Sequence, residues 1–159
     1  MKIKTMKSIT LKFLFPVFLT VLLSSCAGTV QKMYEGDPLD PSEIAFVTTP
    51  KGLFICSVDG QNFYATVPVV TLCHRNIEVI GPHTYKIRAW NGHAPQKESN
   101  TVDITFEAEP GKLYKVYYQN ESSHRLPASL REVTDPEEIK LFYTDLANGK
   151  VKRELPSQK

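Results

Sequence analysis

The sequence contains no apolar run long enough to cross a membrane. Its main apolar block covers residues 13–23 and is interrupted by Pro16, whereas a spanning helix needs roughly 20 consecutive apolar residues. The chain also has little surplus of positive charge, with 19 basic residues against 17 acidic ones. We expect no nucleic-acid partner, because proteins that bind nucleic acid carry a basic face or stripe.

Recognisable catalytic motifs are missing as well. The sequence has no Gly-x-Ser-x-Gly, the turn that presents the nucleophilic serine of many hydrolases. Ser122, Ser123 and His124 are adjacent, but such a run is common in polar surface loops. We therefore predict no catalytic residue.

The residues that could bind a metal are spread along the chain. Imidazole and thiolate groups are the usual ligands of zinc, and the candidates are His74, His83, His93, Cys56 and Cys73. Only Cys73 and His74 are close in sequence, and neighbours on a strand point to opposite faces. We predict no metal and no cofactor beyond covalently attached lipid.

The first 26 residues have the features of an export signal. Lys2, Lys4 and Lys7 precede the apolar block, and small residues lead from it to Cys26. This order is typical of a cleaved signal peptide. Removal of residues 1–25 leaves 134 of the 159 residues and a net charge near −2, which is enough chain for one domain with its own core.

The sequence Leu23-Ser24-Ser25-Cys26 resembles a bacterial lipobox. In that motif, signal peptidase II cuts before a cysteine whose sulfur carries diacylglycerol, and the new amino terminus is commonly acylated too. The resemblance implies that Cys26 carries both lipid groups and anchors the protein on a membrane. Because Ala27 rather than aspartate follows, resemblance to enterobacterial sorting implies the periplasmic face of the outer membrane. A Gram-positive host would place the protein on the outer leaflet of its single membrane.

Cys56 and Cys73 remain as an even pair in an exported chain. Exported proteins can form disulfides, so a bridge between these two residues is one interpretation. The other is a pair of small buried side chains that never meet, because sequence does not give the Cα separation that a bridge requires.

The chain after Cys26 is predicted to hold one domain. Residues 26–42 show no helical or strand periodicity and contain two prolines near their end, which favours a lipidated tether that is either disordered or partly docked through Tyr34 and Leu39. The domain is expected to cover residues 43–149. Residues 150–159 are expected to form a polar tail.

Strands are predicted where β-branched and aromatic residues run between turn signals such as Asp59-Gly60. Alternation of apolar and charged side chains is clearest at residues 85–89 and 102–108, as in half-buried antiparallel strands. The other predicted strands cover residues 44–48, 53–58, 63–72, 77–80, 113–119 and 129–133.

A single helix is predicted for residues 136–147. Asp135 can cap its start, Pro136 suits the first helical position, and Asn148-Gly149 supplies a stop. Apolar residues recur at three- and four-residue spacing, as on one helix face: Ile139, Phe142, Tyr143 and Leu146. About seven short strands and one late helix predict a mainly β fold, a small antiparallel β-sandwich or half-open barrel.

The feature most open to a binding role is a group of aromatic residues. Trp90, His93 and Tyr117, together with the tyrosines at positions 85, 114 and 118, could form a platform for a glycan, peptidoglycan or a protein. Aromatic rings give large contact areas at low entropic cost. Packing of the same rings in the core is the competing interpretation.

Three segments together resemble a group of small proteobacterial lipoproteins and, more loosely, the PEGA-like surface β-domains. They are Ile55-Cys56-Ser57-Val58-Asp59-Gly60, Gly81-Pro82-His83-Thr84-Tyr85-Lys86-Ile87 and Phe106-Glu107-Ala108-Glu109-Pro110-Gly111-Lys112-Leu113-Tyr114. Tyr34-Glu35-Gly36 and Glu43-Ile44-Ala45 resemble the group's amino-terminal part, whereas Ile80 stands where the group has proline. The resemblance covers residues 34–118 and implies a β-sandwich on a lipid anchor, without implying an activity.

These observations lead us to expect a lipid-anchored envelope protein that acts by binding or structural support. Its expected partners are the membrane and an envelope protein or glycan. One alternative is a lipoprotein enzyme acting on peptidoglycan or glycan, which would need a histidine and a carboxylate converging in a cleft. Another is a small-ligand carrier, which would have an apolar pocket between its sheets.

Overall fold

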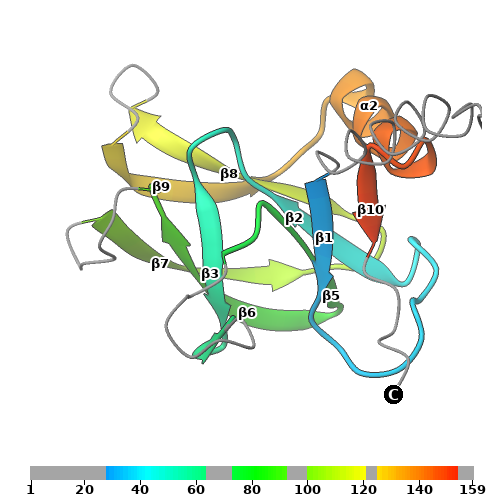
Figure 1. Cartoon of the computed structure of the whole chain (residues 1–159), viewed down its shortest axis with the longest axis horizontal. Helices are drawn as coiled ribbons and strands as arrows, with labels where there is room; N and C mark the ends of the chain where they lie inside the picture. Colours follow the sequence, from blue (N-terminus) through cyan, green and yellow to red (C-terminus); the bar gives the residue numbers. More distant parts are fainter. Residues whose placement is uncertain (1–27, 64–72, 93–99, 121–124, 154–159) are drawn as a thin grey trace, which may run out of the picture.

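The computed structural model describes residues 28–63, 73–92, 100–120 and 125–153 (Figure 1). Within these ranges the chain forms ten strands and one helix. In chain order they are β1 (Gly28–Lys32), β2 (Ile44–Thr48), β3 (Phe54–Val58), β4 (Gln61–Asn62), β5 (Asn76–Ile80), β6 (His83–Trp90), β7 (Thr101–Ala108), β8 (Leu113–Asn120), β9 (Arg125–Glu132), α2 (Pro136–Ala147) and β10 (Val151–Arg153).

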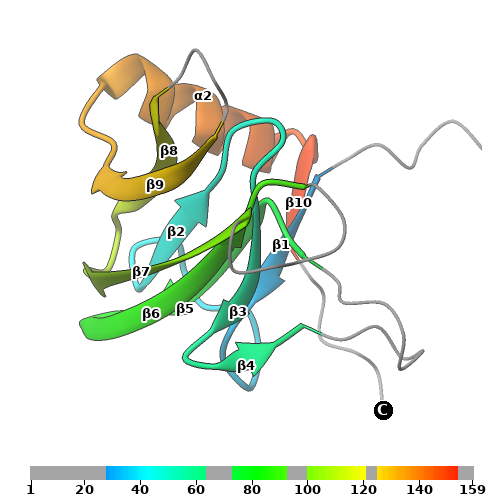
Figure 2. The ribbon, with the colours of Figure 1, turned by 90° about the vertical axis from the view of Figure 1, so that its left-hand side faces the viewer.

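The strands form two sheets that pack face to face. The larger has the order β10-β1-β5-β2-β8-β9 and the smaller the order β4-β3-β6-β7. Figure 2 shows the two layers, with α2 on the outer side of the larger sheet. Buried side chains from both sheets fill the space between them, including Val47, Ile55, Ile77, Ile87 and Val116. The predicted small β-sandwich with one late helix is therefore confirmed.

The pairing of the strands differs from the expected antiparallel pattern. β1 runs parallel to both of its neighbours, β5 and β10, and β2 runs parallel to β8. The described residues also contain ten strands rather than about seven. The short strands β1, β4 and β10 are the additions, and each of them is held by backbone pairing rather than by a recognisable side-chain pattern.

The two strands with the clearest alternation form one regular hairpin. β6 and β7 pair along their full length, from His83 opposite Ala108 to Trp90 opposite Thr101. Ile87 and Ala89 are buried, whereas Lys86 and Arg88 are exposed. One strand face therefore turns to the core and the other to solvent, as the alternation predicted.

The segment predicted as a tether has the docked one of its two expected forms, with Tyr34 and Leu39 packed on the domain, and from Gly28 onward it is also part of the sheet. β1 lies between β5 and β10, and the side chain of Val30 is fully buried. Tyr34 and Leu39 pack against the same buried cluster as Val30. Backbone pairing on both edges satisfies the donors and acceptors of β1, so this segment docks despite its weak side-chain pattern.

The predicted polar tail is corrected in the same way. Val151–Arg153 forms β10 and pairs with β1 in parallel register. The domain therefore extends beyond the expected limits of 43–149 at both ends. β9 likewise begins at Arg125, before the predicted start at 129, and most of the strand predicted for 63–72 lies outside the described residues.

The helix has the predicted bounds and cap. The Asp135 carboxylate accepts a hydrogen bond of 2.9 Å from the backbone N–H of Glu137, which satisfies a free donor of the first turn. The apolar stripe of α2 packs on the outer face of the larger sheet, where the ring of Phe142 lies 5.2 Å from that of Phe46. This face forms a second, smaller core that includes Leu113 and Val133.

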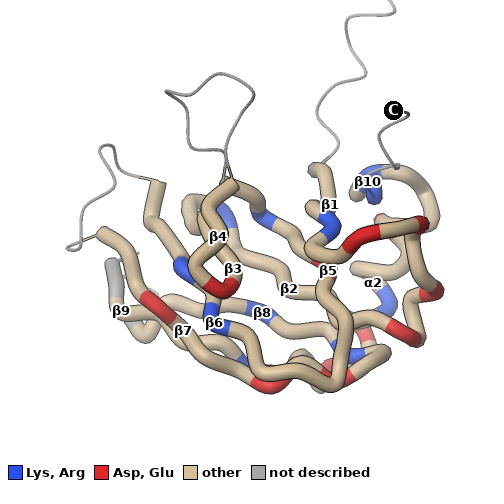
Figure 3. The backbone as a smooth tube through the Cα atoms, turned by 90° about the horizontal axis from the view of Figure 1, so that it is seen from below, with Lys and Arg blue, Asp and Glu red and all other residues tan. Residues whose placement is uncertain are grey.

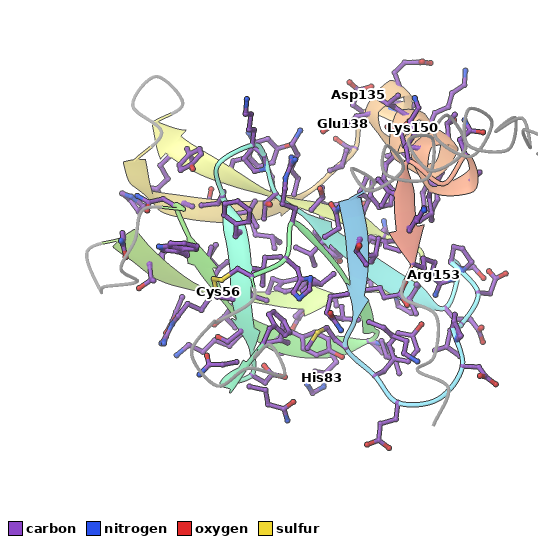
Figure 4. The ribbon with its side chains drawn as sticks, viewed as in Figure 1. Cys56, His83, Asp135, Glu138, Lys150 and Arg153 are labelled. Atoms are coloured by element: carbon purple, nitrogen blue, oxygen red, sulfur yellow. A yellow bond between two sulfur atoms is a disulfide. The ribbon has the colours of Figure 1, made fainter. Side chains whose placement is uncertain are left out.

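A disulfide joins Cys56 of β3 to Cys73, with a Cα separation of 4.3 Å (Figure 4). The bridge interpretation of this pair is therefore confirmed. It ties the smaller sheet to the segment that enters β5 of the larger one, so it links the two layers covalently.

Candidate functional site

The main candidate site is a groove between α2 and one end of the larger sheet. It encloses about 410 Å³ and is lined by both polar and apolar side chains. The residues that matter most to its chemistry are Thr49, Arg75, Lys115, Glu138, Leu141 and Lys150. Pockets of this size are large enough for a small ligand or for part of a larger surface.

The groove forms because the helix does not cover the whole sheet. Strands β5 and β10 begin here and β2 ends here, as the register of Thr48 opposite Asn76 shows. Phe142 holds α2 against β2, while the neighbouring Leu141 turns outward and is 60% exposed. The groove therefore presents an exposed apolar side chain as well as charged groups to solvent.

Three cations line the groove, and two of them are paired with carboxylates of α2. Lys115 Nζ contacts Glu138 Oε1, and Lys150 Nζ lies 3.1 Å from Asp145 Oδ1. Figure 4 labels Glu138 on α2 and Lys150 near the helix. Asp145 Oδ1 is buried, and no donor in the described part of the chain has hydrogen-bond geometry to it. The third cation, Arg75, donates a hydrogen bond of 3.2 Å to the backbone carbonyl of Thr49.

Tyr117, one of the three residues predicted to bind a partner, lies next to this groove. Its ring is 3.9 Å from the Arg131 guanidinium carbon and 5.3 Å from Lys115 Nζ, measured to the ring centroid. The side chain is half-buried on the outer face of the larger sheet. Cation–π contacts of this kind hold the ring beside the groove with positive charge around it.

Trp90 lies on the other side of the sandwich from Tyr117. Its neighbour Ala89 faces the core, so Trp90 turns to the outer face of the smaller sheet, where its ring lies 5.9 Å from that of Phe54. His93 lies outside the described residues. The structure therefore does not bring Trp90 and Tyr117 onto one surface.

The other tyrosines of the expected platform pack into the core. Tyr114 and Tyr118 are buried between the sheets, and Tyr85 packs against the same cluster. The Tyr118 hydroxyl donates to the Gly52 carbonyl at 3.0 Å. Burial raises the pKa of Tyr114 and that of Tyr118 above their usual range. The core-packing interpretation applies to these three rings.

A buried ionic network ties both ends of the domain to the central strand β5. Glu78 is fully buried and accepts hydrogen bonds from Arg153 Nε at 2.6 Å, from Arg153 Nη2 at 3.0 Å and from the Tyr34 hydroxyl at 2.8 Å. Burial disfavours the charged guanidinium, but the hydrogen bonds and the charge of Glu78 outweigh this and raise the pKa of Arg153. Burial also raises the pKa of Tyr34. The network joins three segments that are distant in sequence.

This network and the groove were not predicted from the sequence. The available signal for the network was a single carboxylate, Glu78, inside the apolar strand sequence Asn-Ile-Glu-Val-Ile. A buried carboxylate needs a cation, but nothing local pointed to Arg153. Arg75 and Lys150 each stand immediately before a short strand, and their proximity follows from the parallel pairing alone.

The described ranges bear on two further kinds of site, a metal site and a histidine–carboxylate pair. No three side chains of histidine, cysteine, aspartate or glutamate gather there in a way that could hold a metal ion. His83 Nε2 lies 3.7 Å from Asp59 Oδ2, but both side chains are about half exposed, at 58% and 43%. Across the same ranges, no helix combines the length and apolarity needed to cross a membrane.

Comparison with protein-family models, with curated proteins and with solved structures finds no match to this chain. The groove, the ionic network and the sequence of the first 26 residues are therefore the basis for a proposal about function.

Proposed function

We propose that this protein is a lipid-anchored domain of the bacterial cell envelope that acts by binding or structural support. Cys26 is the attachment site for diacylglycerol and an amino-terminal acyl chain, and residues 1–25 are its cleaved signal. The outer membrane, on its periplasmic face, is the proposed location in a Gram-negative host. The resemblance of Leu23-Ser24-Ser25-Cys26 to a lipobox is the observation that carries the proposal.

Two features of the fold support this proposal. The Cys56–Cys73 disulfide suits a chain exported to an oxidising compartment, and it uses both cysteines of the domain, so that Cys26 alone is left for another role. The first strand begins at Gly28, which fits a mature chain that starts at Cys26 and folds almost immediately after it.

The groove beside α2 supports a binding role over an enzymatic one. Its charged residues are engaged in ion pairs or backbone hydrogen bonds, whereas a general acid or base must be free to exchange a proton with a substrate. Its mixture of exposed leucine, lysine and arginine suits a contact surface. The proposed partners are the membrane and an envelope protein or glycan.

The anchor is tested by metabolic labelling with an alkyne fatty acid in cells that express the full chain. Wild-type protein should incorporate the label and sediment with membranes, whereas Cys26→Ala should do neither. The matched control, Cys56→Ala with Cys73→Ala, removes the other two cysteines and should keep the label. Incorporation of label into Cys26→Ala would refute the lipoprotein proposal.

The binding role is tested by cross-linking in intact envelopes, followed by mass spectrometry of what is captured with the protein. One dominant protein partner, or glycan bound without turnover, would support the proposal. Turnover of a captured glycan by purified protein would contradict it in favour of an envelope enzyme.

A further inference from the structure

The strand nearest the proposed anchor begins at a defined end of the larger sheet. Gly28 pairs with Val151 of β10, and Val30 pairs with Asn76 of β5, in both cases in parallel register. The three strands β10, β1 and β5 therefore start at the same end, near α2 (Figures 1 and 2). Lys150 and Arg75 directly precede β10 and β5, so they flank Gly28 on its two sides.

This end of the domain, called the basic end below, carries exposed positive charge. It comprises Lys51, in the turn after β2, together with Arg75 and Lys150, and all three are exposed. Among the described carboxylates none pairs with Lys51 or Arg75, and Lys150 remains 70% exposed beside Asp145. The exposed Leu141 of α2 lies in the same groove as Arg75 and Lys150.

The opposite end of the domain carries negative charge. The segment between β1 and β2 joins the far end of β1 to Ile44, which pairs with Ile80 at the far end of β5. Four exposed acidic residues lie in this segment: Glu35, Asp37, Asp40 and Glu43. Figure 3 views the molecule from this side and shows both acidic and basic residues along it. The four exposed acidic residues and the exposed cations of the basic end therefore lie at opposite ends of β1, and the groove at the basic end also holds the carboxylates of Glu138 and Asp145.

The link between the anchor and the basic end is short. Cys26 lies two residues before Gly28, and two residues span at most about 7 Å. Adjacent strands are about 4.8 Å apart, and charges in physiological salt interact over roughly 8 Å. The backbone of Lys150 and Arg75 therefore lies within about 12 Å of a lipidated Cys26, and their long side chains can extend from there towards the phosphate groups of the same bilayer.

We propose that the basic end is a membrane-docking surface that rests on anionic phospholipid headgroups. Lys51, Arg75 and Lys150 face lipid phosphates, and Leu141 lies at the boundary between headgroups and acyl chains. The acidic segment between β1 and β2 points away from the bilayer. This inference rests on the proposed lipidation of Cys26 and names the bilayer as the partner of the groove.

The orientation is tested with the full-length lipidated protein, whose acylation is first checked by the mass of its amino-terminal peptide. The protein is reconstituted into vesicles of phosphatidylcholine and phosphatidylglycerol, with a nitroxide on some headgroups. A cysteine is introduced by Lys51→Cys or, as the control at the opposite end, by Asp37→Cys, and it is labelled with a fluorophore. No reductant is added, so that the Cys56–Cys73 disulfide stays intact. Quenching should be at least about twofold stronger at position 51, because of its proximity to the headgroups.

The contribution of charge is tested with the label at position 51. Each basic residue near an anionic bilayer strengthens docking about fivefold, so Arg75→Gln with Lys150→Gln should lower the ratio of docked to undocked protein by about 25-fold. Lys86→Gln with Lys112→Gln removes the same charge elsewhere and should leave quenching unchanged. Vesicles without phosphatidylglycerol should lower the quenching at position 51 as Arg75→Gln with Lys150→Gln does.

The outcomes separate the two proposals. A missing acyl mass on Cys26 would overturn both the anchor and the orientation. With the acyl mass present, equal quenching at positions 51 and 37, or stronger quenching at 37, would overturn the orientation alone. An equal loss of quenching in both pairs of charge variants would overturn the role of Arg75 and Lys150.

Discussion

Replacement of Arg153 by methionine should destabilise the domain far more than removal of an exposed ion pair. Glu78 has no exposed surface, and Arg153 gives its carboxylate two hydrogen bonds, at 2.6 and 3.0 Å. Without the guanidinium, the remaining partner of Glu78 in the described structure is the Tyr34 hydroxyl. Removal of one member of a buried ion pair costs about 3–5 kcal/mol, because it leaves the other charge buried and without a partner.

Arg153 is itself partly exposed at 19%, so the lower end of that range, about 3 kcal/mol, is the expected loss. For a domain of this size it corresponds to a fall in Tm of about 10 °C. Methionine keeps much of the aliphatic packing of arginine. The loss can be measured by urea unfolding of a form that starts at Ala27, followed by the fluorescence of Trp90, the single tryptophan of the chain.

Arg88→Met is the matched control. Arg88 pairs with Asp103 at 2.8 Å, but the two side chains are 48% and 33% exposed, so the expected loss is below about 1 kcal/mol. A loss for Arg153→Met no larger than that of the control would refute the view that Glu78 depends on this partner. The double variant Glu78→Met with Arg153→Met should recover at least half of the stability that Arg153→Met loses, since no unpaired charge is then buried.

Two further predictions concern the disulfide and acid stability. Replacement of Cys56 and Cys73 by serine should lower the free energy of unfolding by about 3 kcal/mol, because the bridge spans 17 residues; an unchanged urea midpoint would contradict this. The hydrogen bonds from Arg88 lower the pKa of Asp103 from 3.8 to about 2, so the pair stabilises the fold above pH 4 and loses this effect as the pH falls towards 2. Solvent screening keeps the effect below about 1 kcal/mol. Asp103→Asn should flatten the loss of stability between pH 4 and 2, and equal pH slopes in variant and wild type would count against the reasoning.

The elements that the sequence predicted well are those whose signals are local. The start of α2 depends on Asp135 and Pro136, which act within one helical turn, and the helix has the predicted bounds. The β6–β7 hairpin alternates at residues 85–89 and 102–108, so one face could be assigned to the core before any partner was known. In both cases the pattern repeats often enough to identify the buried face.

The strands that were missed depend on partners far away in the chain. β1 has the sequence Gly-Thr-Val-Gln-Lys, with Val30 as its buried apolar side chain, and β10 has three residues. Neither carries enough alternation to be recognised alone. Their parallel pairing, and hence the mixed character of the larger sheet, is a property of the assembled sheet rather than of either segment.

The candidate site was predicted less well than the fold. Tyr117 was selected and lies beside the groove, but Trp90 was grouped with it although the two occupy opposite outer faces. Composition indicates that aromatic residues are available, whereas only the parity of each residue on its strand decides which face it occupies. The groove itself requires α2, β5 and β10 to be placed in space.

The position of β1 inside the larger sheet has a consequence for export. If the chain is exported as proposed, β1 is the first of the described strands to leave the secretion channel, and its neighbour β10 follows more than 100 residues later. Until β10 arrives, β1 is the open edge of the sheet and can pair with other chains, and Glu78 lacks Arg153. A chain that stalls or is cut after Lys150 would therefore be recognisable to envelope proteases by an unpaired strand held close to the membrane.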